Sequence, residues 1–157
     1  MGKSGSEATS IGCSLKLIPC APEINGAFIR SLTKENFFEI ISRTLGWDQS
    51  LHEQEPRFPE RYTMVQREGE TIGFFCIREA VDHLYLNTIQ LLPACRNHGY
   101  GTLLLEHIEQ IAKSKTLPKI RLSVFQENPA RFLYQRLGYK ALEVDVSREL
   151  ILMEKLL

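Results

Sequence analysis

Residues 84–101 read LYLNTIQLLPACRNHGYG and decide how the chain folds around them. The run of β-forming residues up to Leu92 predicts a strand, and the helical spacing of apolar residues over 102–114 predicts a helix. The connection carries Gly99 and Gly101, where the main chain can adopt positive φ and be approached closely. The first N–H groups of a helix have no intrahelical partner, and the helix dipole favours negative charge there. The stretch therefore predicts an anion-binding turn.

The length and composition fit one folded domain. The chain has 157 residues, of which 43% are hydrophobic, which suffices for a single core. The first ten residues, MGKSGSEATS, are small and polar. We therefore expect residues 1–12 to be a disordered leader and residues 13–157 to form the domain.

The charge balance and the cysteines limit the partners and the compartment. Nineteen basic residues balance nineteen acidic ones, which argues against nucleic acid or an anionic membrane as the main partner. No apolar run approaches the roughly 18 residues of a spanning helix, and the N-terminus lacks an apolar signal core. The four cysteines are interpreted as free thiols of a cytoplasmic protein, and the oligomeric state, monomer or homodimer, stays open. They are Cys13, Cys20, Cys76 and Cys95.

The remaining pattern predicts alternating strands and helices. Thr33 is the expected N-cap of a helix over 34–45, separate from a helix over 22–32. The polar stretch 47–61 is either a surface connection anchored by Trp47 or a lid over a site. Strands are expected at residues 14–18, 62–67, 71–79, 84–92, 119–125, 139–146 and 148–156, and further helices at 102–114 and 129–137.

Three other kinds of site fail on spacing. A P-loop requires a Gly-x-x-x-x-Gly-Lys-Ser/Thr motif, which does not occur. The pair Gly99 and Gly101 lacks the third glycine of a dinucleotide-binding fingerprint. Cys95 and His98 are one metal-ligand pair without a second at suitable spacing, so no metal site is expected.

Two motifs together give the chain a specific resemblance. Residues 96–101 read RNHGYG after a strand, with Pro93 three residues before Arg96, and residues 128–139 read NPARFLYQRLGY after a second strand. In type, order and spacing they resemble the two signatures of the GNAT superfamily of acetyl-CoA-dependent N-acetyltransferases. The resemblance covers the chain from Ser14 to Leu156.

The resemblance implies an α/β fold of GNAT type. Its mixed, mostly antiparallel sheet has about seven strands and is flanked by about four helices. The sheet splays apart between two parallel central strands, those that begin at Leu84 and at Lys119.

The resemblance also implies acetyl-CoA as cofactor, with its pantetheine arm in that opening and its pyrophosphate on the amides after Arg96. His98 and Tyr100 are expected to serve surface or shape roles. Asn128 is expected to cap the following helix and to contact the cofactor. The implied cofactor-binding residues are Leu91, Leu92, Arg96, Asn97, His98, Gly99, Tyr100, Gly101, Thr102, Asn128 and Tyr134.

The implied catalytic residues are Tyr134 and Gln90. Tyr134 matches the family's tyrosine beside the thioester sulfur, so it is either the general acid for the leaving thiol or an ordinary core tyrosine. The oxyanion is expected at a backbone N–H near Leu91, where the family's strand bulges.

The general base stays open. Related sequences often carry Glu where this chain has Gln90, and an amide cannot take up a proton. Gln90 is left to orient the amine or a water, and a water-relayed path is an equal alternative. Other candidates are His83, Tyr85, Asn87, Glu53, Glu55 and Glu60.

Two functions therefore follow from the sequence. The first is an N-acetyltransferase that acts on a primary amine of a small molecule, peptide or protein by direct attack in a ternary complex. The second, suggested by the missing Glu at Gln90, is a non-catalytic acyl-CoA-binding module. The acceptor is not encoded in any motif.

Overall fold

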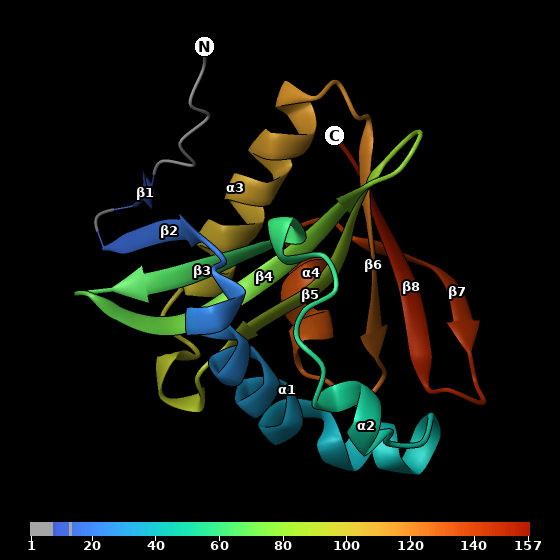
Figure 1. Ribbon diagram of the computed structural model, residues 1–157. Coiled ribbons are helices and arrows are strands. Elements are labelled where there is room, and N and C mark those ends of the chain that lie inside the picture. The colour runs from blue at the N-terminus through green and yellow to red at the C-terminus, as the bar shows by residue number, and fades with distance from the viewer. Residues whose placement is uncertain (1–7, 13) are drawn as a thin grey trace.

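One continuous sheet runs through the protein. The computed structural model describes residues 8–12 and 14–157, within which eight strands follow the order β1-β2-β3-β4-β5-β6-β8-β7 (Figure 1). Every neighbouring pair is antiparallel except β5 and β6. The strands are β1 (Thr9–Ile11), β2 (Leu15–Pro19), β3 (Tyr62–Arg67), β4 (Glu70–Glu79), β5 (Leu84–Leu91), β6 (Lys119–Phe125), β7 (Lys140–Asp145) and β8 (Leu150–Leu156). The predicted α/β class and the single parallel pair are confirmed.

Helices cover both faces of the sheet. The long helix α1 (Pro22–Thr44) lies on one face, while α3 (Tyr100–Ser114) and α4 (Ala130–Arg136) lie on the other (Figure 1). Successive strand residues point to opposite faces, so Phe74 packs with the α1 cluster and Phe75 with the larger α3 cluster.

The structure corrects the prediction of two helices in the region of α1. The helix continues through Thr33, which is therefore not an N-cap. No proline or glycine interrupts residues 27–44, so the helical hydrogen bonding is not broken at the threonine. The freed Thr33 hydroxyl instead lies 3.3 Å from the Gln90 side-chain nitrogen.

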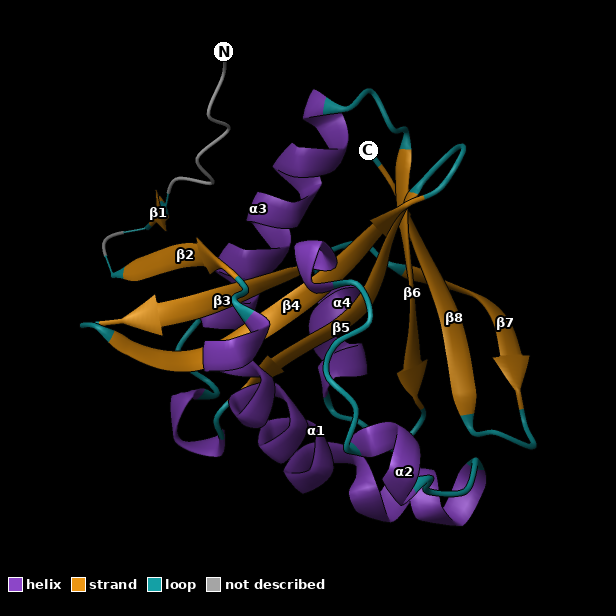
Figure 2. Cartoon of the chain, in the orientation of Figure 1, coloured by secondary structure: helices purple, strands orange, loops and turns teal. Residues whose placement is uncertain are grey.

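The stretch 47–61 folds against the end of α1. It contains the short helix α2 (Gln49–His52) and the 3₁₀ turn η1 (Pro59–Arg61) (Figure 2). The Trp47 ring packs edge-on against Phe38, with 5.1 Å between ring centroids, and lies tilted against His52 at 4.6 Å. Trp47 thus anchors this segment to α1.

Near the N-terminus the structure adds a strand to the expected set. β1 pairs antiparallel with β2, Ser10 lying opposite Lys16, inside the stretch expected to be a leader. Residues 1–7, and Cys13, lie outside the described part of the chain. Cys20, Cys76 and Cys95 carry free thiols. Among the described helices, none combines the length and apolarity needed to span a membrane.

The predicted hairpin is confirmed at β3 and β4. Its two-residue turn is Glu68 and Gly69, which have φ of 52° and 82°. Two successive positive φ angles give the turn the twist that antiparallel strands need.

A bulge at Asn87 controls what β5 presents to each face. Cys76 lies opposite Thr88 and Ile77 lies opposite Leu86, so Asn87 is an extra residue on β5. Before the bulge, the even-numbered Leu86 points to the α3 side of the sheet. After the bulge, the odd-numbered Leu91 points to that side, and Gln90 points toward α1. The bulge was therefore predicted at the wrong place: it lies at Asn87 of β5 and not near Leu91.

β5 and β6 separate soon after they begin. Over the described strands their register contains three pairs, from Leu84 opposite Ile120 to Leu86 opposite Leu122. Beyond Leu86 the two strands diverge, whereas β6 stays paired with β8 along its other edge up to Phe125 (Figure 1). The opening lies beside the carboxyl half of β5.

Gly73 allows β4 to approach β5 at this opening. A Cβ at Gly73 would lie 2.2 Å from the Gln90 carbonyl oxygen and 2.8 Å from a Leu91 methyl. Because the first of these atoms is backbone, a side chain here must push the strands apart. The glycine is thus required by close approach, not by an unusual φ.

We expect Gly73→Ala to lower the free energy of unfolding by about 1–3 kcal/mol, as overpacked sites do. The matched control is Gly26→Ala in α1, where the added Cβ meets the movable side-chain ends of Glu55 and Arg30. Alanine also favours the helix, so the control should change stability little. Urea unfolding of both variants measures the difference. Equal effects would contradict a role for close strand approach.

Candidate active site

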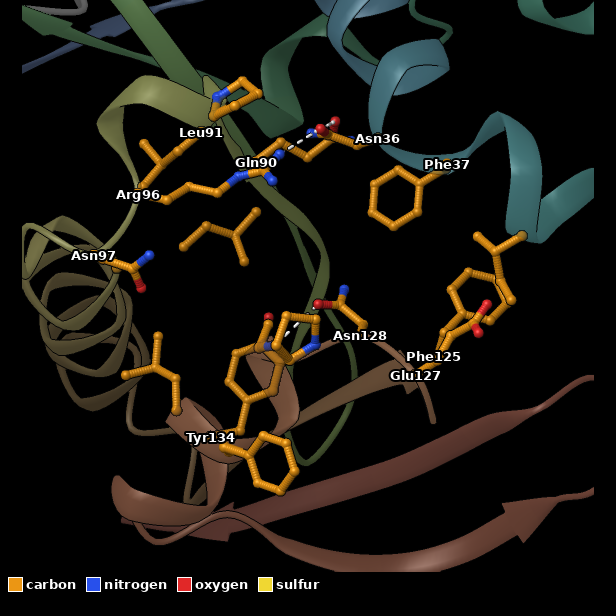
Figure 3. A pocket seen from close by; sticks show the side chains of 18 of the residues that line it. Asn36, Phe37, Gln90, Leu91, Arg96, Asn97, Phe125, Glu127, Asn128 and Tyr134 are labelled. Atoms are coloured by element: carbon orange, nitrogen blue, oxygen red, sulfur yellow. Dashed lines mark hydrogen bonds between the residues drawn. The ribbon is translucent and has the colours of Figure 1, made fainter.

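The opening between β5 and β6 leads into a cavity of about 1050 Å³. Its walls come from α1, the carboxyl half of β5, the first turn of α3, the end of β6 and α4 (Figure 3). The lining residues are Glu35, Asn36, Phe37, Glu39, Ile40, Ile89, Gln90, Leu91, Pro93, Arg96, Asn97, Gly101, Leu105, Phe125, Glu127, Asn128, Pro129, Ala130, Phe132, Leu133, Tyr134 and Arg136.

The N-terminus of α3 forms the end of the cavity suited to an anion. Asn97 and Gly99 have φ of 62° and 81°, which turns the chain from β5 into the helix. The Leu103 N–H donates to the Gly99 carbonyl at 3.2 Å and so makes the first hydrogen bond of the helix. The amides of residues 100–102 precede it at the open helix end, where an anion is favoured.

The predicted cofactor residues divide into two groups. Leu91, Arg96, Asn97, Gly101, Asn128 and Tyr134 line the cavity with Gln90, whereas Leu92, His98, Gly99, Tyr100 and Thr102 contribute no lining side chain. The Tyr100 hydroxyl accepts from Arg67 at 2.9 Å and so ties the start of α3 to β3. The His98 ring contacts the Ala94 carbonyl at 3.3 Å. These two side chains thus contact neighbouring segments and not the cavity.

Tyr134 points from α4 into the cavity, across from Gln90 and Leu91 (Figure 3). The residue is 6% exposed, and its ring packs edge-on against Tyr139 at 5.8 Å. Within the described residues its hydroxyl has no hydrogen-bond partner. Burial raises the pKa of Tyr134, because the phenolate would lose its hydration. The residue therefore keeps its proton at neutral pH.

Asn128 shapes the turn that positions Tyr134. Its side-chain oxygen accepts from the Ala130 N–H at 2.9 Å, as the sequence predicted for a cap. Because α4 begins at Ala130, this bond satisfies one of the first amides of the helix. The side chain also lines the cavity between Tyr134 and Gln90 (Figure 3).

The β5 backbone offers an amide to the opening. The Leu92 N–H donates to the Ile72 carbonyl at 2.8 Å, so it belongs to the edge that pairs with β4. Amides alternate between the two edges of a strand, so the Leu91 N–H points to the opposite edge. That edge faces the unpaired side of β5 beyond Leu86. A free amide thus lies at Leu91 without the bulge that was expected there.

Gln90 is buried, and its direct hydrogen-bond partners are neutral side chains. It is 4% exposed, and its oxygen accepts from the Asn36 amide at 3.2 Å. Its nitrogen donates to Thr88 at 3.0 Å and to Thr33 at 3.3 Å. Asn36 in turn accepts from the Arg96 guanidinium. The network joins α1, β5 and the turn before α3.

None of the alternative bases proposed from the sequence lines this cavity. Glu55 pairs with Arg30 of α1 at 2.8 Å, and Tyr85 donates to Ser123 at 3.0 Å. His83 contacts Asp82 at 2.7 Å. The same holds for Asn87, Glu53 and Glu60.

Several lining residues were not predicted. Asn36 and Phe37 of α1 enter the site because the helix is continuous and crosses the open end of β5. Phe37 approaches Phe125 of β6 at 6.3 Å between ring centroids, on the side of Glu127. Arg43 bonds Glu127 and Glu149, which ties α1 to the loops after β6 and before β8. The one signal in the sequence was that Thr33 and Asn36 lie three residues apart, a spacing that places both on the same face of a helix.

The described residues contain no group of three or more His, Cys, Asp or Glu side chains arranged to hold a metal ion. Cys95 is buried beneath the turn, while His98 is exposed. The pair of Cys95 and His98 is therefore not extended to a larger group of metal ligands among these residues.

Comparison with known proteins identifies the family. The model of the acetyltransferase (GNAT) family matches residues 27–139, which include both signatures. The chain belongs to the GNAT acetyltransferase family. It is 33% identical over 91 residues to the [ribosomal protein bS18]-alanine N-acetyltransferase of Haemophilus influenzae, covering 57% of this chain and 61% of that protein. It is 34% identical over 79 residues to the 5-NmdU N-acetyltransferase of Pseudomonas phage PaMx11, covering 48% and 54%. The alignments thus span little more than half the length of these relatives.

Solved structures share the GNAT fold over nearly the whole chain. Ard1 from Thermoplasma volcanium superposes with a TM-score of 0.71 at 14% identity, covering 92% of this chain and 98% of that one. The PaiA N-acetyltransferase from Thermoplasma acidophilum, solved in complex with coenzyme A, gives 0.68 at 20% identity, covering 92% and 99%. At these identities the likeness establishes the fold.

In this GNAT domain, we expect Gly101→Asp to abolish binding of coenzyme A while the fold remains. A carboxylate at the first turn of α3 repels phosphate, and the new Cβ meets only the Leu133 methyl at 3.0 Å, a movable group. Gly69→Asp in the β3–β4 turn adds the same charge away from the cavity and is the control. Isothermal titration measures binding. Near-wild-type affinity of the Gly101 variant would place the phosphate site elsewhere.

Proposed function

We propose that this protein is an N-acetyltransferase that moves the acetyl group of acetyl-CoA to a primary amine by direct attack in a ternary complex. The observation that carries the proposal is one cavity with the open N-terminus of α3 at one end and, in its wall, the buried Tyr134 hydroxyl, which has no hydrogen-bond partner among the described residues. The free thiols of Cys20, Cys76 and Cys95 fit a cytoplasmic protein.

The geometry supports acetyl-CoA as the donor. Its pyrophosphate would lie on the amides at the start of α3, near Arg96. Its pantetheine arm carries amides that would pair with the unpaired edge of β5, as an added strand does. The thioester would then lie between Leu91 and Tyr134, where the two walls of the cavity face each other (Figure 3).

The transfer balances with the groups present. The nitrogen of the free amine attacks the thioester carbonyl, and the oxyanion that forms accepts from the Leu91 N–H. The C–S bond breaks, and the sulfur takes the proton of the Tyr134 hydroxyl to leave as a thiol. The nitrogen loses its extra proton to water, and solvent returns a proton to Tyr134. The products are the acetamide and coenzyme A.

The relatives support amines as the acceptor class. One is named as an N-acetyltransferase of an alanine of ribosomal protein bS18, and another as a 5-NmdU N-acetyltransferase. Primary amines of peptides, proteins and small molecules are therefore the acceptors to test.

Gln90 favours a second candidate, a non-catalytic acyl-CoA-binding module. A buried amide in place of a carboxylate leaves the cavity floor unable to take up a proton. Transfer of radiolabelled acetyl groups to a panel containing an alanine-initiated peptide, Nα-acetyl-lysine amide and spermidine separates the two. Tight binding without transfer would favour the module.

Acetyl-CoA should stabilise the folded protein. At 100 times the dissociation constant, one bound ligand adds about 2.7 kcal/mol to the free energy of unfolding. A thermal scan with and without millimolar acetyl-CoA measures the shift, and Gly101→Asp serves as the non-binding control. An unchanged melting temperature of the wild type would remove the cofactor assignment.

Tyr134→Phe should lower kcat by about 10²-fold, the low end for general acid catalysis, while acetyl-CoA affinity stays nearly constant. The ring and its packing on Tyr139 remain, so only the donor is lost. The loss should shrink as pH rises from 6.5 to 9.5, because a thiolate with a pKa of about 8.5 needs its proton less there. An unchanged kcat across this range would make Tyr134 a core tyrosine only.

A further inference from the structure

Arg96 fixes which group donates and which accepts in the hydrogen bonds from Arg96 through Asn36 to Gln90. A guanidinium can only donate, so the Asn36 oxygen must face Arg96. The Asn36 nitrogen then faces Gln90 and donates to its oxygen at 3.2 Å. Turning either amide over would place two donors against each other, one of them beside the buried Gln90 side chain or the Arg96 guanidinium. Asn36 therefore holds the Gln90 amide in one orientation.

That orientation presents an acceptor to the cavity. Asn36, the partner of the Gln90 oxygen, lines the cavity, whereas Thr33 and Thr88, the partners of the nitrogen, do not. Both hydrogens of the Gln90 amide have partners, and its oxygen keeps one of two lone pairs free. The free lone pair matches an N–H donor, such as the acceptor amine.

The same network leaves no proton acceptor at this point. Gln90, Asn36 and Asn128 are neutral amides, and burial keeps Tyr134 protonated. The carboxylates on the walls, Glu35, Glu39 and Glu127, belong to exposed residues. A bound ammonium would thus face a carbonyl that orients it and cannot deprotonate it.

Resting on the proposed function, we infer that the site binds its acceptor as the free-base amine, oriented by the Gln90 carbonyl, which Asn36 positions. The site therefore selects weakly basic amines such as peptide α-amines. An α-amine has a pKa of about 7.7–8.0 and a lysine side chain about 10.4. At pH 7 the free-base fraction of the α-amine is larger by about 300-fold.

The first test compares two acceptors on the wild-type protein with saturating acetyl-CoA: an alanine-initiated peptide and Nα-acetyl-lysine amide. Without an enzymatic base, kcat/KM should rise about tenfold per pH unit and level off at the pKa of each acceptor. Two inflections separated by about 2.5 pH units are expected. A single inflection shared by both acceptors would reveal a titrating base and overturn the inference.

The second test asks whether Asn36 acts through Gln90. Asn36→Leu removes both bonds. It should raise the KM for the amine about three- to tenfold, the effect of losing one hydrogen bond. In a Gln90→Met background, Asn36→Leu should add almost nothing to that KM. Additive effects would show that Asn36 is structural and would overturn its positioning role.

Gln110→Glu is the control for these variants, since Gln110 is exposed on α3 and lies outside the cavity. It should leave KM and both pH profiles unchanged. The tests also separate this inference from the proposed function. If the wild type binds acetyl-CoA and acetylates no amine, the function itself fails. If it acetylates amines with a shared inflection, the function stands and the free-base inference fails.

Discussion

The separation of β5 from β6 is the constraint on which the site depends. The two parallel strands pair at three positions and then diverge. Beyond the last pair, the backbone N–H and C=O groups on the facing edges of β5 and β6 do not pair with each other. Such groups need partners, because an unpaired buried amide costs about as much as a lost hydrogen bond. A ligand with its own amides would supply such partners. The gap in the sheet is thus the place where the edge of β5 opens to the cavity.

Local irregularities place the functional side chains around this gap. The bulge at Asn87 changes which residues of β5 face each layer, so that Gln90 meets α1 while Leu91 meets the α3 side. Gly73 permits β4 to stay close at the same level. The Asn128 cap starts α4 where Tyr134 can reach the cavity from the opposite wall. The bulge, the glycine and the cap are each local features, and together they bring three segments of the chain to the cavity.

The family motifs could be read from the sequence because their chemistry is local. A turn that exposes helix amides needs glycine or asparagine at positive φ, and residues 97 and 99 meet this need. The Asn128 cap and the β3–β4 turn likewise depend on neighbours a few residues away. The boundary expected at Thr33 failed because a capping residue signals a helix start only when the chain before it leaves the helix. The bulge position failed because a register shift depends on the partner strand.

The sequence by itself predicted most of the strands and helices through their periodicity, with β1 and the continuity of α1 as the exceptions. Its two signatures carried the resemblance from which the family and the parallel pair followed. The tertiary structure alone decided which polar groups share the cavity. It left the candidate bases outside the cavity lining and brought Asn36 of α1, 54 positions earlier in the chain, onto Gln90. Contacts between segments that far apart depend on how helix and sheet pack, and no local pattern encodes that packing.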